Sequence, residues 1–299
     1  MPEAGTRLFD LPLRGAGGEP ISFARTLYSH GCARLAPATI ETSPLTYRRS
    51  FRFDGRAFEV RLREERGRLV GRTFGPIGKR DAERARAAVA RMFRLEDDLA
   101  PFYAAIAGDE GLSWAAAGAG RMLASPTIFE DVIKTICTTN CAWSATVRMT
   151  KALVGLGEGA FPEPELLAQT PDAWYSSVAR MGYRGPYVRT IARDVAAGRL
   201  DLAALLPSRG LDDDEVEKRL LALPGVGPYA AAHVMQLLGR HRRLVLDSWT
   251  RPTYLRLTGK KRAKDSTIRR AFARYGAYAG LAFWLLLTRD WVNEEADTP

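Results

Sequence analysis

Leu223-Pro224-Gly225-Val226-Gly227-Pro228-Tyr229 decides the fold, because it separates two amphipathic segments, Asp212 to Leu221 and Pro228 to Leu238. The two glycines permit a turn with positive φ and leave bare backbone at the surface. Pro228 suits the first position of the following helix. The amides at that helix start lack intrahelical partners, so they can bind a phosphate, with a monovalent cation held by the loop carbonyls. The stretch predicts a helical hairpin that contacts nucleic acid without reading sequence, although an ordinary helix–helix turn has the same pattern.

Asp247 follows the second of these helices after the apolar run Leu244-Val245-Leu246. It stands where another helix begins, with Ser248 beside it, so capping that helix is its structural role. A fixed carboxylate in a dry pocket can also stabilise positive charge that develops during a reaction. The two roles are compatible.

The amino-terminal part has a different periodicity. Residues from about Tyr47 to Phe74 alternate as strands do, and Asp54-Gly55 favours a two-residue hairpin turn. After Gly75-Pro76 the period becomes helical. The sequence therefore predicts an α+β fold: an antiparallel β domain over residues 1–78 and an all-α part over 79–299. Helices are expected over Lys79–Arg94, Leu95–Ala107, Pro126–Leu156, Pro171–Met181 and Pro186–Ala197, and in the last third around the hairpin and up to about Trp291.

Composition favours a polyanionic partner. The 299 residues include 44 Lys and Arg against 34 Asp and Glu, which gives a net charge of +10. The sequence shows no signal peptide and no apolar run long enough to span a bilayer, so a cytosolic protein is expected. Cys32, Cys137 and Cys141 form no paired Cys-x-x-Cys motif, and no histidine cluster completes a zinc or iron–sulfur site. We expect reduced structural thiols and no cofactor.

The hairpin and the spacing to Asp247 together resemble the helix-hairpin-helix (HhH-GPD) DNA glycosylase superfamily. The resemblance covers most of the chain. It is closest to the branch that holds 8-oxoguanine and 3-methyladenine DNA glycosylases, which lacks an iron–sulfur cluster and adds an amino-terminal sheet domain. It implies two helical lobes with a cleft between them for DNA and the base, and Asp247 as the catalytic carboxylate. The DNA-backbone residues that it implies are Pro224, Gly225, Val226, Gly227 and Tyr229.

Position 229 indicates the type of reaction. Bifunctional members of the family carry a lysine there, which attacks the sugar and forms a Schiff base. Here it is Tyr229, and no lysine occurs between Lys218 and Lys260. The resemblance therefore implies a monofunctional enzyme that leaves an abasic site.

A flipped base leaves a gap in the duplex that must be filled. Asn140, in the segment from Thr135 to Trp143, matches the family's asparagine that enters this gap. Tyr183 and Arg184 match its tyrosine wedge and the arginine that hydrogen-bonds the orphaned base. Alternatively, Tyr183 belongs to the core and Arg184 clamps a phosphate. Ala145 replaces a second arginine of the 8-oxoguanine enzymes, so strict choice of an opposite cytosine is not expected.

The residues matching the family's base pocket are largely apolar. Phe283 replaces a glutamine that reads the base edge, Leu287 replaces a stacking phenylalanine, and His233 replaces a stacking cysteine. Trp249, two residues after Asp247, adds aromatic surface. Such a pocket favours alkylated purines, whose positive charge suits ring stacking.

The sequence thus predicts a monomeric enzyme of base excision repair, cytoplasmic and associated with the nucleoid, that acts on double-stranded DNA containing a damaged base. Two alternatives remain open. One is a glycosylase for 8-oxoguanine or another oxidised or modified base. The other is a helix-hairpin-helix protein that binds DNA lesions without cutting them, with Asp247 as a helix cap.

Overall fold

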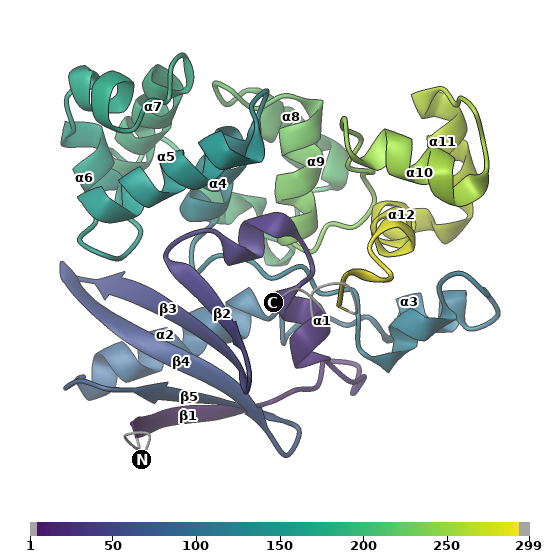
Figure 1. Cartoon of the computed structure of the whole chain (residues 1–299), viewed down its shortest axis with the longest axis horizontal. Coiled ribbons are helices and arrows are strands. Elements are labelled where there is room, and N and C mark those ends of the chain that lie inside the picture. The colour runs from purple at the N-terminus through teal and green to yellow at the C-terminus, as the bar shows by residue number, and fades with distance from the viewer. Residues whose placement is uncertain (1–4, 293–299) are drawn as a thin grey trace.

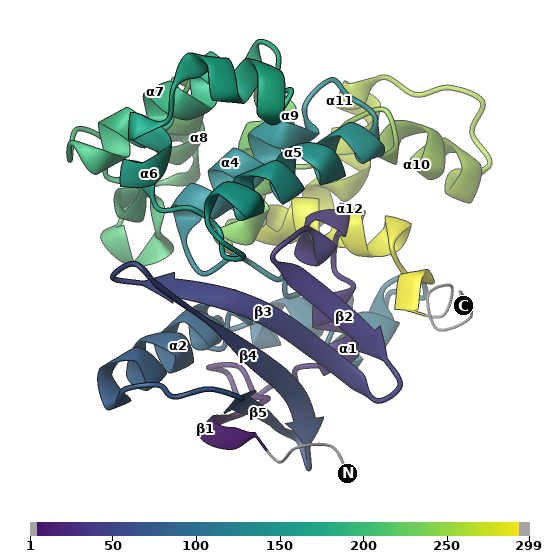
Figure 2. The ribbon, with the colours of Figure 1, turned by 60° about the vertical axis from the view of Figure 1, so that its left-hand side comes forward.

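A five-stranded antiparallel sheet forms the base of the molecule, with helices stacked above it (Figures 1 and 2). The structure is a computed structural model, and it describes residues 5–292. The strand order is β1-β5-β4-β3-β2, which confirms the predicted α+β class. The strands are β1 (Thr6–Pro12), β2 (Ala38–Thr42), β3 (Leu45–Phe53), β4 (Arg56–Glu65) and β5 (Arg68–Thr73).

Two tight turns set the register of the central strands. Asp54 and Gly55 join β3 to β4 with φ of 50° and 78°, the two positive values that a type I′ turn requires. Arg66 and Gly67 join β4 to β5 with φ of 54° and 73°. The first turn confirms the prediction, whereas β1 and β2 were not anticipated because neither shows a clear alternation of apolar residues.

The first long helix packs against the sheet. In α2 (Lys79–Met92), Ala85, Val89 and Met92 are buried in the same apolar core as Tyr47 and Val60 of the sheet. Its extent agrees with the predicted helix that begins at Lys79. The sheet's hydrophobic core therefore continues past residue 78 into the first helix.

The helical part surrounds α4 (Ile128–Thr138), in which every residue from Ile128 to Cys137 is buried. The prediction of one helix over Pro126–Leu156 is wrong, because Asn140 has φ of 46° and the chain turns there before α5 (Trp143–Leu156) begins. The other α-helices are α1 (Phe23–Leu27), α3 (Ala100–Ile106), α6 (Pro164–Gln169), α7 (Arg184–Ala196), α8 (Asp213–Leu221), α9 (Pro228–Leu237), α10 (Thr250–Thr258), α11 (Asp265–Phe272) and α12 (Ala279–Leu287). Short helical turns are η1 (Gly31–Arg34), η2 (Ser113–Ala117), η3 (Trp174–Val178), η4 (Leu202–Leu205), η5 (Pro207–Arg209) and η6 (Ala273–Tyr278).

Two separate apolar cores hold the helices. One joins α4, α5, α7, α8 and α9, and the other joins α3, α10, α11 and α12. A buried ion-pair network ties the first to the sheet, since Glu130 of α4 lies 2.6 Å from Arg49 of β3 and 2.7 Å from Lys134. No helix within residues 5–292 is both long and apolar enough to cross a membrane.

Candidate active site

The hairpin has the geometry that its sequence predicts. Gly225 lies between α8 and α9 with φ of 82°, and a Cβ there would be 2.7 Å from the ring of Tyr187. Only glycine fits this position. Val226 is buried in the helical core, so it anchors the loop and does not face solvent. No side chain caps the start of α9 after Gly227, which leaves its first amides available to an anion.

Asp247 is both a helix cap and an accessible carboxylate. Its Oδ1 accepts hydrogen bonds from the amides of Trp249 (2.8 Å) and Thr250 (2.7 Å), and its own amide donates to Thr250 Oγ1 (2.8 Å). These bonds fix the side chain at the start of α10. Within the described part of the chain, Oδ2 has no hydrogen-bond partner. The half-buried carboxylate can therefore face a ligand with one oxygen while the other holds it in place.

Tyr229, in the first turn of α9, belongs to the same site. Its hydroxyl lies 3.1 Å from Thr138 Oγ1, and its ring stacks on His233 at 6.2 Å between centroids. Burial raises the pKa of Tyr229, and the nearby negative charge of Asp247 adds to this increase. The phenol is therefore neutral, and Tyr229 lies between α4 and the apolar cluster that contains Val245, two residues before Asp247.

The two predicted wedge residues come together from separate segments. The Asn140 side-chain amide donates to the Tyr183 hydroxyl at 3.4 Å, and half of the Tyr183 side chain is exposed. The third predicted residue, Arg184, does not project into solvent beside them. It is buried, its guanidinium donates to the Thr139 carbonyl, and it lies 4.5 Å from the Tyr183 ring centre. Arg184 therefore braces the loop that carries Asn140.

The predicted pocket residues divide into two groups. Trp249 is 39% exposed and packs against Trp284 at 5.9 Å, so it offers an aromatic face beside Asp247. Phe283 and Leu287 are almost inaccessible to solvent, and their assignment to the base pocket stays a prediction. Both are buried in the second helical core, because α12 is apolar on all sides and lies among α10, α11 and η6.

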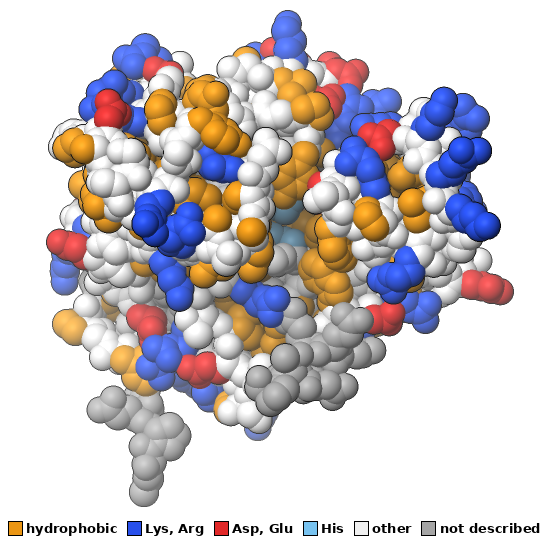
Figure 3. Space-filling model, turned by 45° about the horizontal axis from the view of Figure 1, so that its top comes forward, with side chains coloured by type: hydrophobic (Ala, Val, Ile, Leu, Met, Phe, Trp, Pro, Cys, Tyr) orange, Lys and Arg blue, Asp and Glu red, His pale blue; other side chains and the backbone are white. Residues whose placement is uncertain are grey.

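A hollow opens between the helical parts of the molecule (Figure 3). Hydrophobic side chains surround it, histidine is visible at its base, and Lys and Arg gather on the surfaces to either side. An apolar recess between basic surfaces is suited to an aromatic ligand attached to a polyanion.

Sequence reasoning missed a cluster of three side chains, His30, Cys32 and His233. One ligand atom from each lies within 4.8 Å of the others. Burial lowers the pKa of His30 to about 4 and that of His233 to about 3, so both imidazoles are neutral. The close spacing of His30 and Cys32 was a usable signal, but His233 is two hundred positions away and only the fold brings it near.

Comparisons with known proteins agree with this geometry. No family model matches the chain. A probable N-glycosylase/DNA lyase from Methanothermobacter thermautotrophicus is 26% identical, and the match spans 58% of this chain and 62% of the relative. The chain thus matches less than two thirds of that protein's length.

Three solved structures resemble nearly the whole chain. MBOgg1 in complex with a low-affinity DNA ligand has a TM-score of 0.72 at 19% identity and covers 98% of this chain and 97% of its own. The 3-methyladenine DNA glycosylase from Archaeoglobus fulgidus has a TM-score of 0.70 at 20% identity, with 95% and 98% covered. The Clostridium acetobutylicum 8-oxoguanine glycosylase/lyase, bound to double-stranded DNA with cytosine opposite 8-oxoguanine, has a TM-score of 0.68 at 16% identity, with 93% and 94% covered. These neighbours include a 3-methyladenine DNA glycosylase and an 8-oxoguanine glycosylase/lyase, and this chain shares their fold.

Proposed function

We propose that this chain is a monofunctional DNA glycosylase that flips a damaged base out of duplex DNA and hydrolyses its N-glycosidic bond. The observation that carries the proposal is the Asp247 carboxylate. One of its oxygens is fixed by two backbone amides, and Tyr229 of the hairpin helix packs against the small apolar cluster that contains Val245, two residues before Asp247. The hairpin and the reactive group thus belong to one site.

Departure of the base builds positive charge on the sugar. A carboxylate that is already oriented stabilises this charge without reorganising, which is the electrostatic contribution that lowers such barriers most. The free Oδ2 of Asp247 can face the sugar or orient the attacking water. The capping bonds support this role, because they fix the orientation of the carboxylate before DNA binds.

The proposed reaction has no covalent intermediate between the enzyme and the sugar. Tyr229 cannot form a Schiff base, although the curated relative is named a glycosylase/lyase. The buried Lys134 does not replace the missing amine, because its ammonium pairs with Glu130 at 2.7 Å and donates to the Leu35 carbonyl at 3.3 Å. Water is therefore the nucleophile, and the product is an abasic site.

Three parts of the chain would contact the DNA. The free amides at the start of α9, with a monovalent cation on the hairpin carbonyls, would bind the backbone of the lesion strand. The exposed basic loop of residues 260–264 adds phosphate contacts. Asn140 and Tyr183 would fill the gap that the flipped base leaves.

The proposed substrates are alkylated purines. Trp249 presents an aromatic face beside Asp247, and electron-poor or cationic rings stack well on such a surface. The solved neighbours include a 3-methyladenine DNA glycosylase and an 8-oxoguanine glycosylase/lyase, so an oxidised purine is the second candidate. We favour alkylated bases because α12 has no polar side chain at the position that contacts the base edge in the 8-oxoguanine enzymes. Phe283 occupies that position and is buried.

A lesion panel tests the proposal. Duplexes with one defined lesion each, paired against all four bases, are incubated with the chain and then treated with alkali to cleave abasic sites. We expect strand cleavage at alkylated purines only after alkali. Cleavage only at 8-oxoguanine would move the assignment to the second candidate. Tight binding without cleavage of any lesion would make the chain a lesion-binding protein.

A further inference from the structure

Two buried histidines and a cysteine meet where the sheet domain contacts the hairpin helix. His30 and Cys32 lie at the start of η1, between α1 and β2, and His233 projects from the middle of α9. The His30 and His233 rings meet edge to face at 5.3 Å between centroids. The three possible ligand atoms all lie within 4.8 Å of one another. Neither the proposed DNA contacts nor the proposed chemistry uses this cluster.

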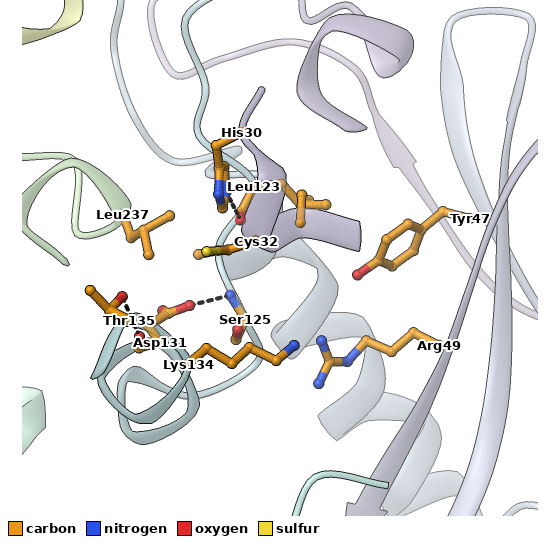
Figure 4. Close-up of a pocket in the computed structure, with 12 residues that line it drawn as sticks. His30, Cys32, Tyr47, Arg49, Leu123, Ser125, Asp131, Lys134, Thr135 and Leu237 are labelled. Carbon is orange, nitrogen blue, oxygen red and sulfur yellow. Dashed lines mark hydrogen bonds between the residues drawn. The ribbon is translucent and has the colours of Figure 1, made fainter. Parts of the chain in front are cut away.

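The hydrogen bond of His30 directs its lone pair. Nε2 donates to the Leu123 carbonyl at 2.8 Å, so the neutral ring carries its proton on Nε2 and leaves Nδ1 bare. Figure 4 shows this bond, with the Cys32 thiol directly below the imidazole in that view. Metal-binding histidines characteristically donate their second nitrogen to a carbonyl or carboxylate in this manner.

Two nitrogens of the cluster are buried without a partner. Neither His30 Nδ1 nor His233 Nε2 has a hydrogen bond within residues 5–292, although both residues are more than nine-tenths buried. An unsatisfied polar atom in this position costs roughly 1–3 kcal/mol. Two such atoms beside a free thiol indicate that a bound species satisfies them.

We propose that His30 Nδ1, Cys32 Sγ and His233 Nε2 bind a zinc ion. Imidazole and thiolate are the ligands that zinc prefers, and a tetrahedral shell places ligand atoms roughly 3.5 Å apart. The three residues already offer ligand atoms within 4.8 Å of one another, so small side-chain rotations can bring them to this spacing. The Cys32 thiol loses its proton to solvent as the bond to the metal forms.

The coordination shell is incomplete with protein atoms alone. No fourth histidine, cysteine or carboxylate joins the group among the described residues. Zinc sites with three protein ligands keep the fourth position for water or another small ligand. His233 stacks on Tyr229, so the three-residue cluster adjoins the candidate active site.

The ion joins two units that are distant in the sequence. It links η1, in the amino-terminal region, to α9, which carries the hairpin. Binding that favours the folded state stabilises it according to the free metal concentration. Zinc therefore fixes the hairpin helix relative to the sheet domain.

Metal analysis of the full chain tests the proposal. The chain is purified without a polyhistidine tag, stripped with a chelator and incubated with zinc alone. We expect one equivalent of zinc to be retained after desalting, and a rise in Tm. X-ray absorption at the zinc edge should show one sulfur ligand at about 2.3 Å and nitrogen ligands at about 2.0 Å. A chain that retains no zinc overturns the proposal.

Variants assign the ligands. Cys32→Ser and His233→Gln should each reduce retained zinc at least tenfold, whereas Cys141→Ser, which changes a cysteine outside the cluster, should retain the full equivalent. Cobalt provides a second readout on the wild-type chain, because a Cys32 thiolate gives a sulfur-to-cobalt charge-transfer band that Cys32→Ser removes. Should a variant fail to fold, the wild-type absorption data decide alone, and a zinc shell without sulfur overturns the assignment.

Discussion

The side-chain amide of Asn140 donates to the hydroxyl of Tyr183 at 3.4 Å, although 43 positions separate the two residues. Asn140 has φ of 46° in the turn after α4, and Tyr183 precedes α7 with half of its side chain exposed. The two side chains therefore form one projecting unit. Arg184 braces this unit, because its guanidinium donates to the carbonyl of Thr139, the residue before Asn140.

Removal of the wedge should slow excision. Tyr183→Ala loses a stacking surface worth about 1–3 kcal/mol per base, so single-turnover excision should fall between roughly fivefold and a hundredfold. Tyr183→Phe keeps the ring and should stay near the wild-type rate. If Tyr183→Ala excises as fast as Tyr183→Phe, the tyrosine is not a wedge.

Arg184 should affect stability more than base choice. Arg184→Met leaves the Thr139 carbonyl without its donor and should lower the free energy of unfolding by about 1–3 kcal/mol, measured by urea denaturation. Its preference among the four opposite bases should match the wild type. A stable variant with altered opposite-base preference would return Arg184 to the role of base reader.

The chain should form no covalent adduct with DNA. Tyr229 has no amine, so borohydride added during turnover should trap nothing, and strand cleavage should require alkali. Tyr229→Phe should retain excision, because the hydroxyl contacts only Thr138 among the described residues. A trapped adduct in the wild type would reveal a lyase that uses another lysine.

Acid should weaken a buried ion pair between Glu19 and Arg121. Burial raises the pKa of Glu19, but the Leu99 amide and the Arg121 guanidinium outweigh it and hold the pKa below 4.5. The pair therefore stabilises the fold above about pH 4.5, and this contribution is lost as pH falls through the lower folded pKa. Glu19→Gln should cost about 3–5 kcal/mol at pH 7, because it leaves Arg121 buried and uncompensated.

Urea unfolding at pH 7 and at pH 3 measures this difference. It should be smaller at pH 3, because below pH 4.5 the unfolded wild-type chain takes up a proton at Glu19 and the contribution of the ion pair declines. Glu165→Gln, a substitution at an exposed carboxylate on α6, should leave stability unchanged at either pH. A Glu19→Gln penalty that does not depend on pH contradicts the ion-pair explanation.

Short sequence motifs correctly predicted the turns whose conformation depends on the residues within the turn itself. Asp54-Gly55 and the hairpin at Gly225 both need positive φ, and each is found where the sequence indicated it. Phe283 and Leu287 were assigned to the base pocket by their place in a motif. Which side of α12 faces the cleft depends on packing against α10 and α11, which the local sequence does not encode.

Features that depend on distant contacts were missed. The turn at Asn140 separates two stretches that both have helical periodicity, and no proline or glycine marks the break, so periodicity alone joined α4 to α5. His30 and Cys32 meet His233 only after the sheet domain packs against α9. The candidate carboxylate was found because its spacing from the hairpin is local.

Single-turnover excision by Asp247→Asn tests the central claim most directly. The amide oxygen can still cap α10, so the fold and the Kd for lesion-bearing duplex should match the wild type. The rate should fall by roughly a hundredfold or more, because the charge that stabilises the sugar is gone. Ser248→Ala, a neighbouring change that keeps the carboxylate, should cleave normally. Excision by Asp247→Asn at the wild-type rate would contradict the account.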